Sequence, residues 1–246
     1  YCTFIFVSYV FSKTNNKWFN CWSRKRLRNY EALLFGSIGS IVETSEIQRK
    51  SFNKAFKQYG LNWNWTKREY LSLLNKSGGK DRISRYANKK KEIVNSSYLR
   101  NLKTKIFNNY LKKNHLKLRP GVKNLISICK KEKIKIAFVS STSSNNINAI
   151  LYSLRNSINK RDFNFIGNSK LVKKFKPSPE IYLLSLKKLK LKANDCVAIE
   201  DTQESLNSAS RAKIKCIIFP GKFHSSNKFI GAYKKVYRLN KNIILR

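Results

Sequence analysis

The residues IKIAFVSSTSSNNINAILYSL (134–154) predict a β-strand, a polar turn and an α-helix in direct succession. The segment 134–139 is almost wholly apolar and rich in β-branched side chains, as in a buried strand. A serine-rich turn follows it, and from residue 145 the apolar residues recur at helical spacing. This succession is the repeating unit of a parallel α/β sheet.

Similar units lie on both sides of residues 134–154. We expect further strands at 32–36, 163–166, 196–199 and 215–219, with helices at 122–131, 179–189 and 203–211. Between the first strand and the second, the apolar pattern has helical spacing throughout, with a break at Lys76–Lys80. The sequence therefore predicts a parallel α/β core (31–44 and 118–246), with a helical insertion at 45–117.

The composition excludes several classes of protein. With 246 residues, of which 41% are hydrophobic, the chain has enough apolar mass to form a core. No uncharged apolar stretch reaches the length of a membrane-spanning helix. The cysteines lie far apart without a CxxC pair, which argues against a zinc ribbon or a redox motif and suits a reducing compartment: Cys2, Cys21, Cys129, Cys196 and Cys216.

The formal net charge of +39 leaves two interpretations open. It fits a partner that is a polyanion such as nucleic acid, which is possible but not favoured. It also fits a compositional bias towards lysine, asparagine and isoleucine, as in A+T-rich genomes. The even spread of lysine along the chain favours the bias.

Residues 1–30 differ from the rest of the chain. They are basic, contain aromatic residues and serine, and carry no acid, since the first acidic residue is Glu31. Such a segment resembles an organelle transit sequence. An N-terminal strand or a basic tail is the alternative.

Polar residues follow several of the predicted strands. In parallel α/β sheets, ligands bind beyond the carboxyl ends of the strands. The candidates there are Gly36-Ser37-Ile38, Ser140 and Glu200-Asp201, and Lys176 precedes a helix. Glu200 and Asp201 are the only adjacent pair among 13 acids.

Seven segments resemble, in family order, the haloacid dehalogenase (HAD) superfamily of phosphohydrolases and, more closely, the plastid and bacterial CbbY-type sugar-bisphosphate phosphatases. They are LLFGSIGSIVET (33–44), QRKSFNKAFKQYGLNWNW (48–65), SGGKDRI (77–83), RPGV (119–122), IAFVSSTS (136–143), KPSPEIY (176–182) and VAIEDTQESL (197–206). The resemblance implies a HAD-like Rossmannoid core with a helical cap that closes over the substrate.

The family's known chemistry implies roles for several residues in the core. Lys176 matches the lysine that neutralises the transferring phosphate, and Ser140, with Ser141 beside it, matches the phosphate-binding hydroxyl. Glu200 and Asp201 match the acids that hold Mg²⁺. In the cap, Arg49, Lys80 and Arg82 stand where a second phosphate would be gripped, and Glu43 where it could face the sugar hydroxyls. Solvated charges are the alternative for these cap cations, and a helix N-terminal acid for Glu43.

The first family motif departs from the pattern. The position of the aspartate nucleophile is Gly36, and that of the general acid/base is Ile38. Glycine has no side chain to attack phosphorus, and isoleucine transfers no proton. Ser37 lies between them, and a side chain one residue along a strand points to the opposite face, which makes Ser37 a poor substitute nucleophile. Mg²⁺ also loses a carboxylate ligand, so its site is expected to be weakened or lost.

Three hypotheses follow. The chain is a pseudoenzyme that binds a phosphorylated sugar, or a working phosphatase that uses an unusual route, or a basic scaffold or RNA-binding protein that reuses the fold. The resemblance favours a sugar bisphosphate such as xylulose-1,5-bisphosphate as the ligand, a monomer, and a plastid stroma location, with another soluble intracellular location as the alternative.

Overall fold

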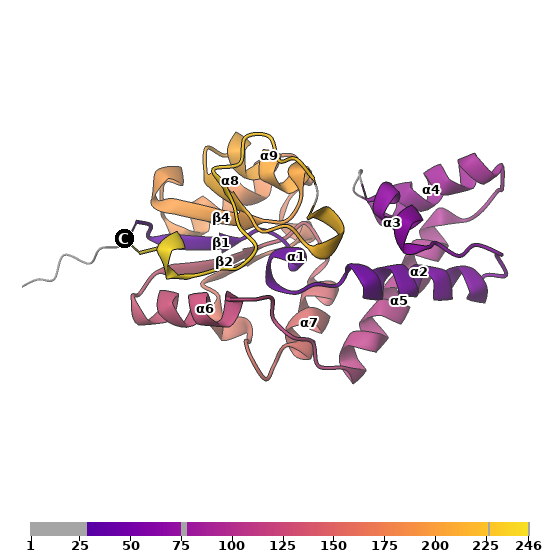
Figure 1. Ribbon diagram of the computed structural model, residues 1–246, viewed down its shortest axis with the longest axis horizontal. Helices are drawn as coiled ribbons and strands as arrows, with labels where there is room; N and C mark the ends of the chain where they lie inside the picture. The colour runs from indigo at the N-terminus through magenta and orange to yellow at the C-terminus, as the bar shows by residue number, and fades with distance from the viewer. Residues whose placement is uncertain (1–28, 75–77, 226, 246) are drawn as a thin grey trace, which may run out of the picture.

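Within the part of the chain that the structure describes, six parallel strands form one sheet in the order β3-β2-β1-β4-β5-β6 (Figure 1). The computed structural model describes residues 29–74, 78–225 and 227–245. The strands are β1 Ala32–Phe35, β2 Lys135–Val139, β3 Phe165–Gly167, β4 Cys196–Glu200, β5 Lys215–Ile218 and β6 Lys234–Lys235. The predicted α/β fold with a parallel sheet is confirmed, and the five predicted strands lie within two residues of their predicted ends. The predicted leader falls almost entirely outside the described residues.

The sheet is covered by helices on both faces. Successive β1 side chains alternate between two apolar clusters: Leu33 and Phe35 pack with α6 (Val122–Lys131) and α7 (Ser144–Ser153). Ala32 and Leu34 pack with α8 (Glu180–Leu189) and α9 (Gln203–Arg211). Because a strand buried on both faces needs apolar residues at every position, β1 appears in the sequence as the continuous run ALLF.

The strand β6 was missed by the sequence analysis. It consists of Lys234 and Lys235, both exposed at the edge of the sheet. Charged side chains on an edge strand discourage pairing with other chains, and such a strand has no apolar pattern to reveal it.

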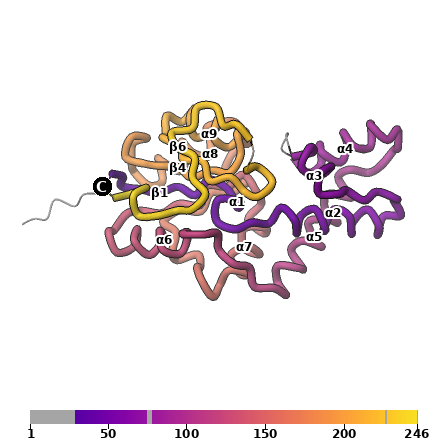
Figure 2. Tube along the Cα trace, viewed as in Figure 1, coloured from indigo at the N-terminus to yellow at the C-terminus, as the bar shows by residue number. Residues whose placement is uncertain are grey.

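Four helices between β1 and β2 form a helical unit with its own apolar cluster. They are α2 Ser45–Gln58, α3 Lys67–Leu73, α4 Gly79–Lys90 and α5 Ser96–Lys113. Phe52, Phe56, Trp63 and Trp65 lie at the centre of this cluster with rings in mutual contact. The trace enters the unit through α2 and leaves it through α5 (Figure 2).

The helix α5 joins the helical unit to the sheet. Its Leu99 belongs to the aromatic cluster of the unit, whereas Phe107 and Leu111, two to three turns further on, belong to the cluster beneath the sheet. No helix within the described ranges is long and apolar enough to cross a membrane.

Candidate functional site

The register of the sheet brings the ends of β1, β2 and β4 to one level. Phe35 pairs with Phe138 on one side and with Ile199 on the other. The next residues along these strands are therefore Gly36, Val139 and Glu200, and the Gly36 amide donates to the Ile199 carbonyl at 2.9 Å. Ser140 and Asp201 follow one residue later, so the predicted core residues meet at one edge.

The space beside Gly36 is filled by two side chains. A Cβ atom at residue 36 would lie 2.0 Å from Glu200 Oε1 and 2.1 Å from the Tyr182 hydroxyl. The Tyr182 hydroxyl donates to Glu200 Oε1 at 2.6 Å, and both residues are fully buried. The volume that a nucleophile's side chain would need is thus occupied by a carboxylate and a phenol.

Lys176 forms a buried ion pair with Glu200. Its Nζ lies 2.5 Å from Glu200 Oε1, with the two side chains 7% and 0% exposed, and it also donates to the Gly36 carbonyl. Burial raises the pKa of Glu200, although Lys176 opposes this rise. Burial and the Glu200 charge raise the pKa of Tyr182 well above its ordinary value, so the phenol stays a donor. The second oxygen, Glu200 Oε2, is buried without a hydrogen-bond partner.

Asp201 contacts the loop after β1. Its Oδ1 accepts a hydrogen bond from the Ser37 hydroxyl at 2.8 Å. The expectation that Ser37 points away from the site is therefore wrong: the strand ends at Phe35, and Ser37 is the N-cap of the short helix α1 (Ile38–Ile41). The alternation of side chains along a strand does not extend into a cap.

Ser140 and Ser141 lie where the sequence predicts, after β2. Ser140 is buried, and its hydroxyl accepts a hydrogen bond from the Thr142 amide at 3.2 Å. The Ser141 hydroxyl accepts one from the Lys176 amide at 3.5 Å. The turn after β2 thus adjoins the loop that carries Lys176, and both hydroxyls keep their protons for another acceptor.

The residues at this edge do not form a magnesium site by themselves. Mg²⁺ requires near-octahedral oxygen coordination, usually with one or two carboxylates beside phosphate and water. Glu200 Oε1 is engaged by Lys176 and Tyr182, and Asp201 Oδ1 by Ser37. Within the described ranges, no cluster of three or more histidine, cysteine or acidic residues could hold a metal.

Two of the predicted cap cations bind within the helical unit. Arg49 forms a two-pronged contact with Glu46 at 2.6 and 3.0 Å and donates to the Trp65 carbonyl. Arg82 is buried, donates to the Leu73 carbonyl at 3.0 Å and lies over the Tyr70 ring, while burial lowers its pKa. Lys80, in the first turn of α4, is exposed.

Glu43 lies at the junction of the core and the helical unit. Its two oxygens accept from the Ser45 amide at 2.9 Å and the Lys222 amide at 3.0 Å. Burial raises the pKa of Glu43, but these hydrogen bonds and Arg119 outweigh it, so the pKa is lowered. The carboxylate therefore stays ionised and ties the start of α2 to η4 (Lys222–His224).

Arg119 is a positioning residue that the sequence analysis did not assign. Its guanidinium stacks 3.4 Å from the Phe219 ring centroid and donates to the carbonyls of Gly39, Phe219 and Pro220. It thus fixes the short helix α1, which follows β1, against the loop after β5. The only signal in the sequence is its place in RPGV, at the end of the helical unit.

Lys103 is a second residue that the sequence analysis missed. It is 8% exposed, donates to Gln48 Oε1 at 2.9 Å and lies between the rings of Phe52 and Phe107. Burial, with smaller contributions from Arg82 and Arg100, lowers its pKa to about 7. No signal separates this lysine from its many neighbours in the sequence.

Comparison with known proteins identifies the family. The profile of the haloacid dehalogenase-like hydrolases matches residues 39–219. The chain is 33% identical over 205 residues to Protein CbbY of Cereibacter sphaeroides, covering 82% of this chain and 89% of that one. The chain belongs to the haloacid dehalogenase-like hydrolase family. Within the family it is of the CbbY type, since the CBBY-like protein of Arabidopsis thaliana is also 31% identical, covering 82% of this chain and 66% of the relative.

Solved structures of this family share the fold. CbbY from Rhodobacter sphaeroides in complex with phosphate superposes with a TM-score of 0.77 at 32% identity, covering 84% of this chain and 93% of that chain. A mutant of the same protein, with xylulose-(1,5)bisphosphate bound, superposes equally well. The family resemblance drawn from the seven segments is thereby confirmed.

Proposed function

We propose that this protein binds a phosphorylated sugar between its core and its helical unit, which acts as the cap, and that it hydrolyses this sugar slowly or not at all. The observation that carries the proposal is the site around Gly36. There Lys176, paired with Glu200, lies beside the turn that carries Ser140 and Ser141. The volume of the missing nucleophile is occupied by Glu200 and Tyr182. A bound sugar bisphosphate in a similar structure supports the class of ligand.

The residues present supply binding but no attack on phosphorus. Lys176 would place its ammonium against the phosphate oxygens, and serine hydroxyls would donate to them. No carboxylate follows β1 to form a covalent intermediate, and Ile38 cannot donate a proton to the leaving oxygen. Ser37, whose hydroxyl donates to Asp201, leaves room for a faint activity.

A weak response to magnesium is part of the same proposal. The acids Glu200 and Asp201 each spend an oxygen on a neighbour, and a third carboxylate is missing at residue 36. A bound phosphate would have to supply much of the coordination. We therefore expect Mg²⁺ to raise sugar bisphosphate affinity only slightly.

Calorimetric titration with xylulose-1,5-bisphosphate, paired with mass spectrometry of released phosphate, tests the proposal. We expect measurable binding and a rate far below the roughly 1–10³ per second of ordinary enzymes. Rapid release would contradict the loss of catalysis. Failure of any phosphorylated sugar in a panel to bind would contradict the whole proposal.

Two exposed lysines of α4 make a matched pair for the cap's part. Lys80→Ala is expected to weaken bisphosphate binding about tenfold, the value of one charge-assisted contact. Lys89→Ala, at the other end of the same helix, is expected to change nothing. Equal affinities of the two variants would show that α4 does not grip the second phosphate.

A further inference from the structure

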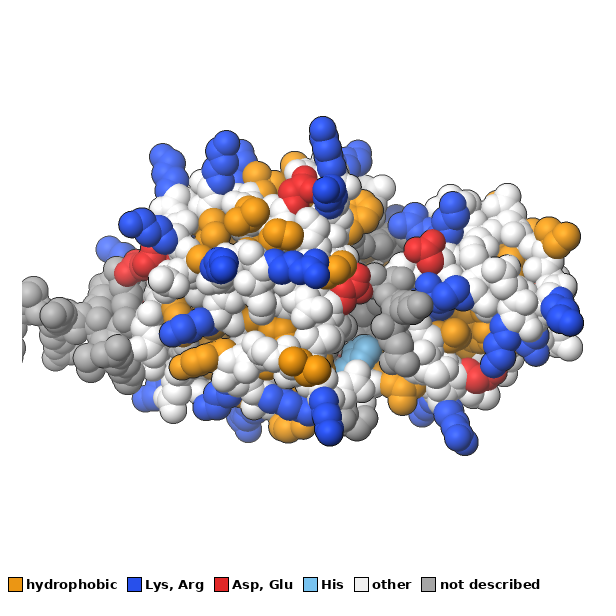
Figure 3. Space-filling view, turned by 90° about the horizontal axis from the view of Figure 1, so that it is seen from above, with side chains coloured by type: hydrophobic (Ala, Val, Ile, Leu, Met, Phe, Trp, Pro, Cys, Tyr) orange, Lys and Arg blue, Asp and Glu red, His pale blue; other side chains and the backbone are white. Residues whose placement is uncertain are grey.

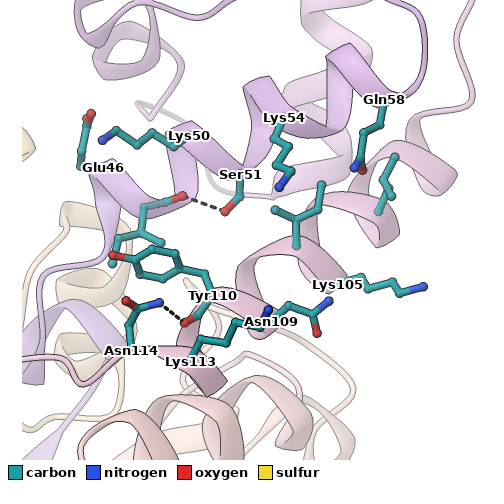
Figure 4. Close-up of a pocket in the computed structure, with 13 residues that line it drawn as sticks. Glu46, Lys50, Ser51, Lys54, Gln58, Lys105, Asn109, Tyr110, Lys113 and Asn114 are labelled. Carbon is teal, nitrogen blue, oxygen red and sulfur yellow. Dashed lines mark hydrogen bonds between the residues drawn. The ribbon is translucent and has the colours of Figure 1, made fainter.

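A groove of about 740 Å³ runs between α2 and α5 on the helical unit (Figure 4). Four lysines line it, two from each helix: Lys50, Lys54, Lys105 and Lys113. All four are exposed, and no acid within the described ranges forms an ion pair with them. The single acid in the lining, Glu46, is already paired with Arg49. Four lysines against this one acid, which also interacts with Lys50, leave the groove with a surplus of positive charge.

The floor of the groove is apolar. Ile47, Leu102 and Ile106 line it and are only partly buried, with Tyr110 at one end 44% exposed. Figure 4 shows Lys50 and Lys54 of α2 across the groove from Lys105 and Lys113 of α5. An apolar strip with lysines on both sides is complementary to an amphipathic helix whose apolar stripe has acidic residues on both sides.

The rest of this chain does not fit the groove. Residues 1–28 carry six lysines and arginines and no acid, so like charges would oppose their docking. A second copy brings a net charge of +39 with it. Repulsion of this kind is screened only beyond about 8 Å at physiological salt. The occupant must be acidic and must come from another molecule.

The lining also disfavours nucleic acid. Surfaces for single strands combine cations with several aromatic platforms, and arginine is favoured for phosphate. This groove has no arginine and one exposed ring, Tyr110. A phosphate backbone would leave the apolar floor of the groove without a complementary contact. A purely electrostatic surface would also need no apolar floor, since lysine and arginine side chains are spread over the visible face of both the core and the helical unit (Figure 3).

We propose that the groove between α2 and α5 docks an acidic amphipathic helix of a partner protein. From Glu46 to Gln58 the helix α2 rises about 18 Å at 1.5 Å per residue, which accommodates about 12 residues of a bound helix. The partner's apolar residues would cover Ile47, Leu102 and Ile106, and its acids would pair with the flanking lysines. The groove shares no lining residue with the candidate site around Gly36, so we expect docking here not to compete with a phosphorylated sugar.

Fluorescence anisotropy with a labelled synthetic helix of about 15 residues, with leucines on one face and glutamates on its flanks, tests the proposal. We expect saturable binding that weakens with salt. A scrambled peptide with the same composition keeps the charge but loses the stripe, and we expect it to bind at least tenfold more weakly. Equal binding of the two peptides would overturn the proposal, because charge alone would explain it.

Charge reversals locate the binding surface. The double variant Lys54→Glu/Lys105→Glu is expected to lower the affinity for the peptide at least tenfold. Ile106→Asn is also expected to lower this affinity, because it puts a polar side chain into the apolar floor of the groove. The matched control is Lys187→Glu/Lys188→Glu on α8, which changes two exposed lysines of the core. Circular dichroism checks that each variant is folded. An equal loss of peptide affinity in the control variant would overturn the proposal. So would an oligothymidylate that binds more strongly than the peptide and loses its binding in the Lys54→Glu/Lys105→Glu variant.

Discussion

The core and the helical unit use their predicted site residues in opposite ways. In the core, Lys176, Glu200 and the Gly36 carbonyl lie in direct contact, although the chain separates them by up to 164 residues. In the helical unit, Arg49 and Arg82 satisfy carbonyls and an acid of the unit itself. Both sets were assigned from the same family resemblance, yet only the core set gathers around one point.

The difference has a physical origin. A parallel sheet fixes which residues meet, because strand register brings the ends of neighbouring strands to one edge. A helical unit has no such constraint, and a cation on a helix turns to whichever acceptor lies nearest. In a chain with 52 lysines and arginines, a cation at a family-like position is therefore weak evidence of a ligand contact.

The largest effect is expected from restoring the lost carboxylates of the core. Gly36→Asp/Ile38→Asp should raise Mg²⁺-dependent phosphate release by about 10³-fold or more, because it supplies the nucleophile and the proton donor. The new side chain needs the space now held by Glu200 and Tyr182. We therefore expect the added change Tyr182→Phe, which removes the hydroxyl 2.1 Å from the position of the new Cβ atom, to raise the rate further. Single-turnover phosphate release measures these rates.

Gly36→Asn/Ile38→Asn is the matched control for this rescue. It fills the same volume without a carboxylate, so its rate should stay at the level of the natural sequence. A folded Gly36→Asp/Ile38→Asp variant that remains inactive would mean that the core has lost more than its first motif. The contrast between an intact core and a diverted helical unit would then break down.

The buried ion pair of the core should carry the next largest effect. Lys176→Met leaves the Glu200 carboxylate buried without its cation, which costs about 3–5 kcal/mol of the free energy of unfolding at pH 7. Without Lys176, the pKa of Glu200 should rise further above its ordinary value. Between the ordinary pKa of glutamate in the unfolded chain and the raised pKa of Glu200 in the folded variant, the folded state binds more protons than the unfolded state. The variant's stability therefore falls as the pH rises through that range. Urea unfolding at several pH values measures this dependence.

The double variant Lys176→Met/Glu200→Gln is the control for this prediction. It removes both charges, so most of the stability should return and its dependence on pH in this range should disappear. If Lys176→Met were equally destabilised at every pH, the loss would come from packing rather than from the unpaired Glu200.

The sheet and its site were predictable because they rest on local patterns and on topology. Alternating strand and helix signals predicted five of the six described strands, and strand ends predicted Ser140, Glu200 and Asp201 as neighbours of Gly36. Lys176, which precedes a helix, was assigned through the family resemblance. The edge strand β6 carries no apolar pattern, and Ser37 changes direction because a helix cap begins there. Both failures occur where a regular period ends.

Long-range contacts between single side chains were beyond the reach of sequence. Tyr182 fills the space beside Gly36 only because α8 packs under the sheet, and Arg119 reaches the Gly39 and Pro220 carbonyls across the core. Glu43 could be predicted to be ionised near a helix start, but not to accept from Lys222, 179 residues away. Such pairings depend on tertiary packing and leave no spacing in the chain.

The smallest of the three effects concerns the buried lysine of the helical unit. The pKa of Lys103 is lowered to about 7 from 10.5, so the unfolded chain binds more protons than the folded protein between these values. The cost of burying Lys103 is therefore largest at and below pH 7, and stability rises as the pH increases towards 10.5. Lys103→Met should remove this slope and stabilise the protein at pH 7 by about 1–4 kcal/mol, less what is lost from the contacts with Gln48 and the two rings.

Thermal unfolding of Lys103→Met between pH 6 and 10 measures the change. Lys105→Met, which changes an exposed neighbour on α5, is the control that should leave the slope unchanged. A Lys103→Met variant less stable at every pH would show that this lysine holds the helical unit together through Gln48, Phe52 and Phe107. The helical unit would then be using Lys103, like Arg49 and Arg82, for its own structure rather than keeping it at a cost.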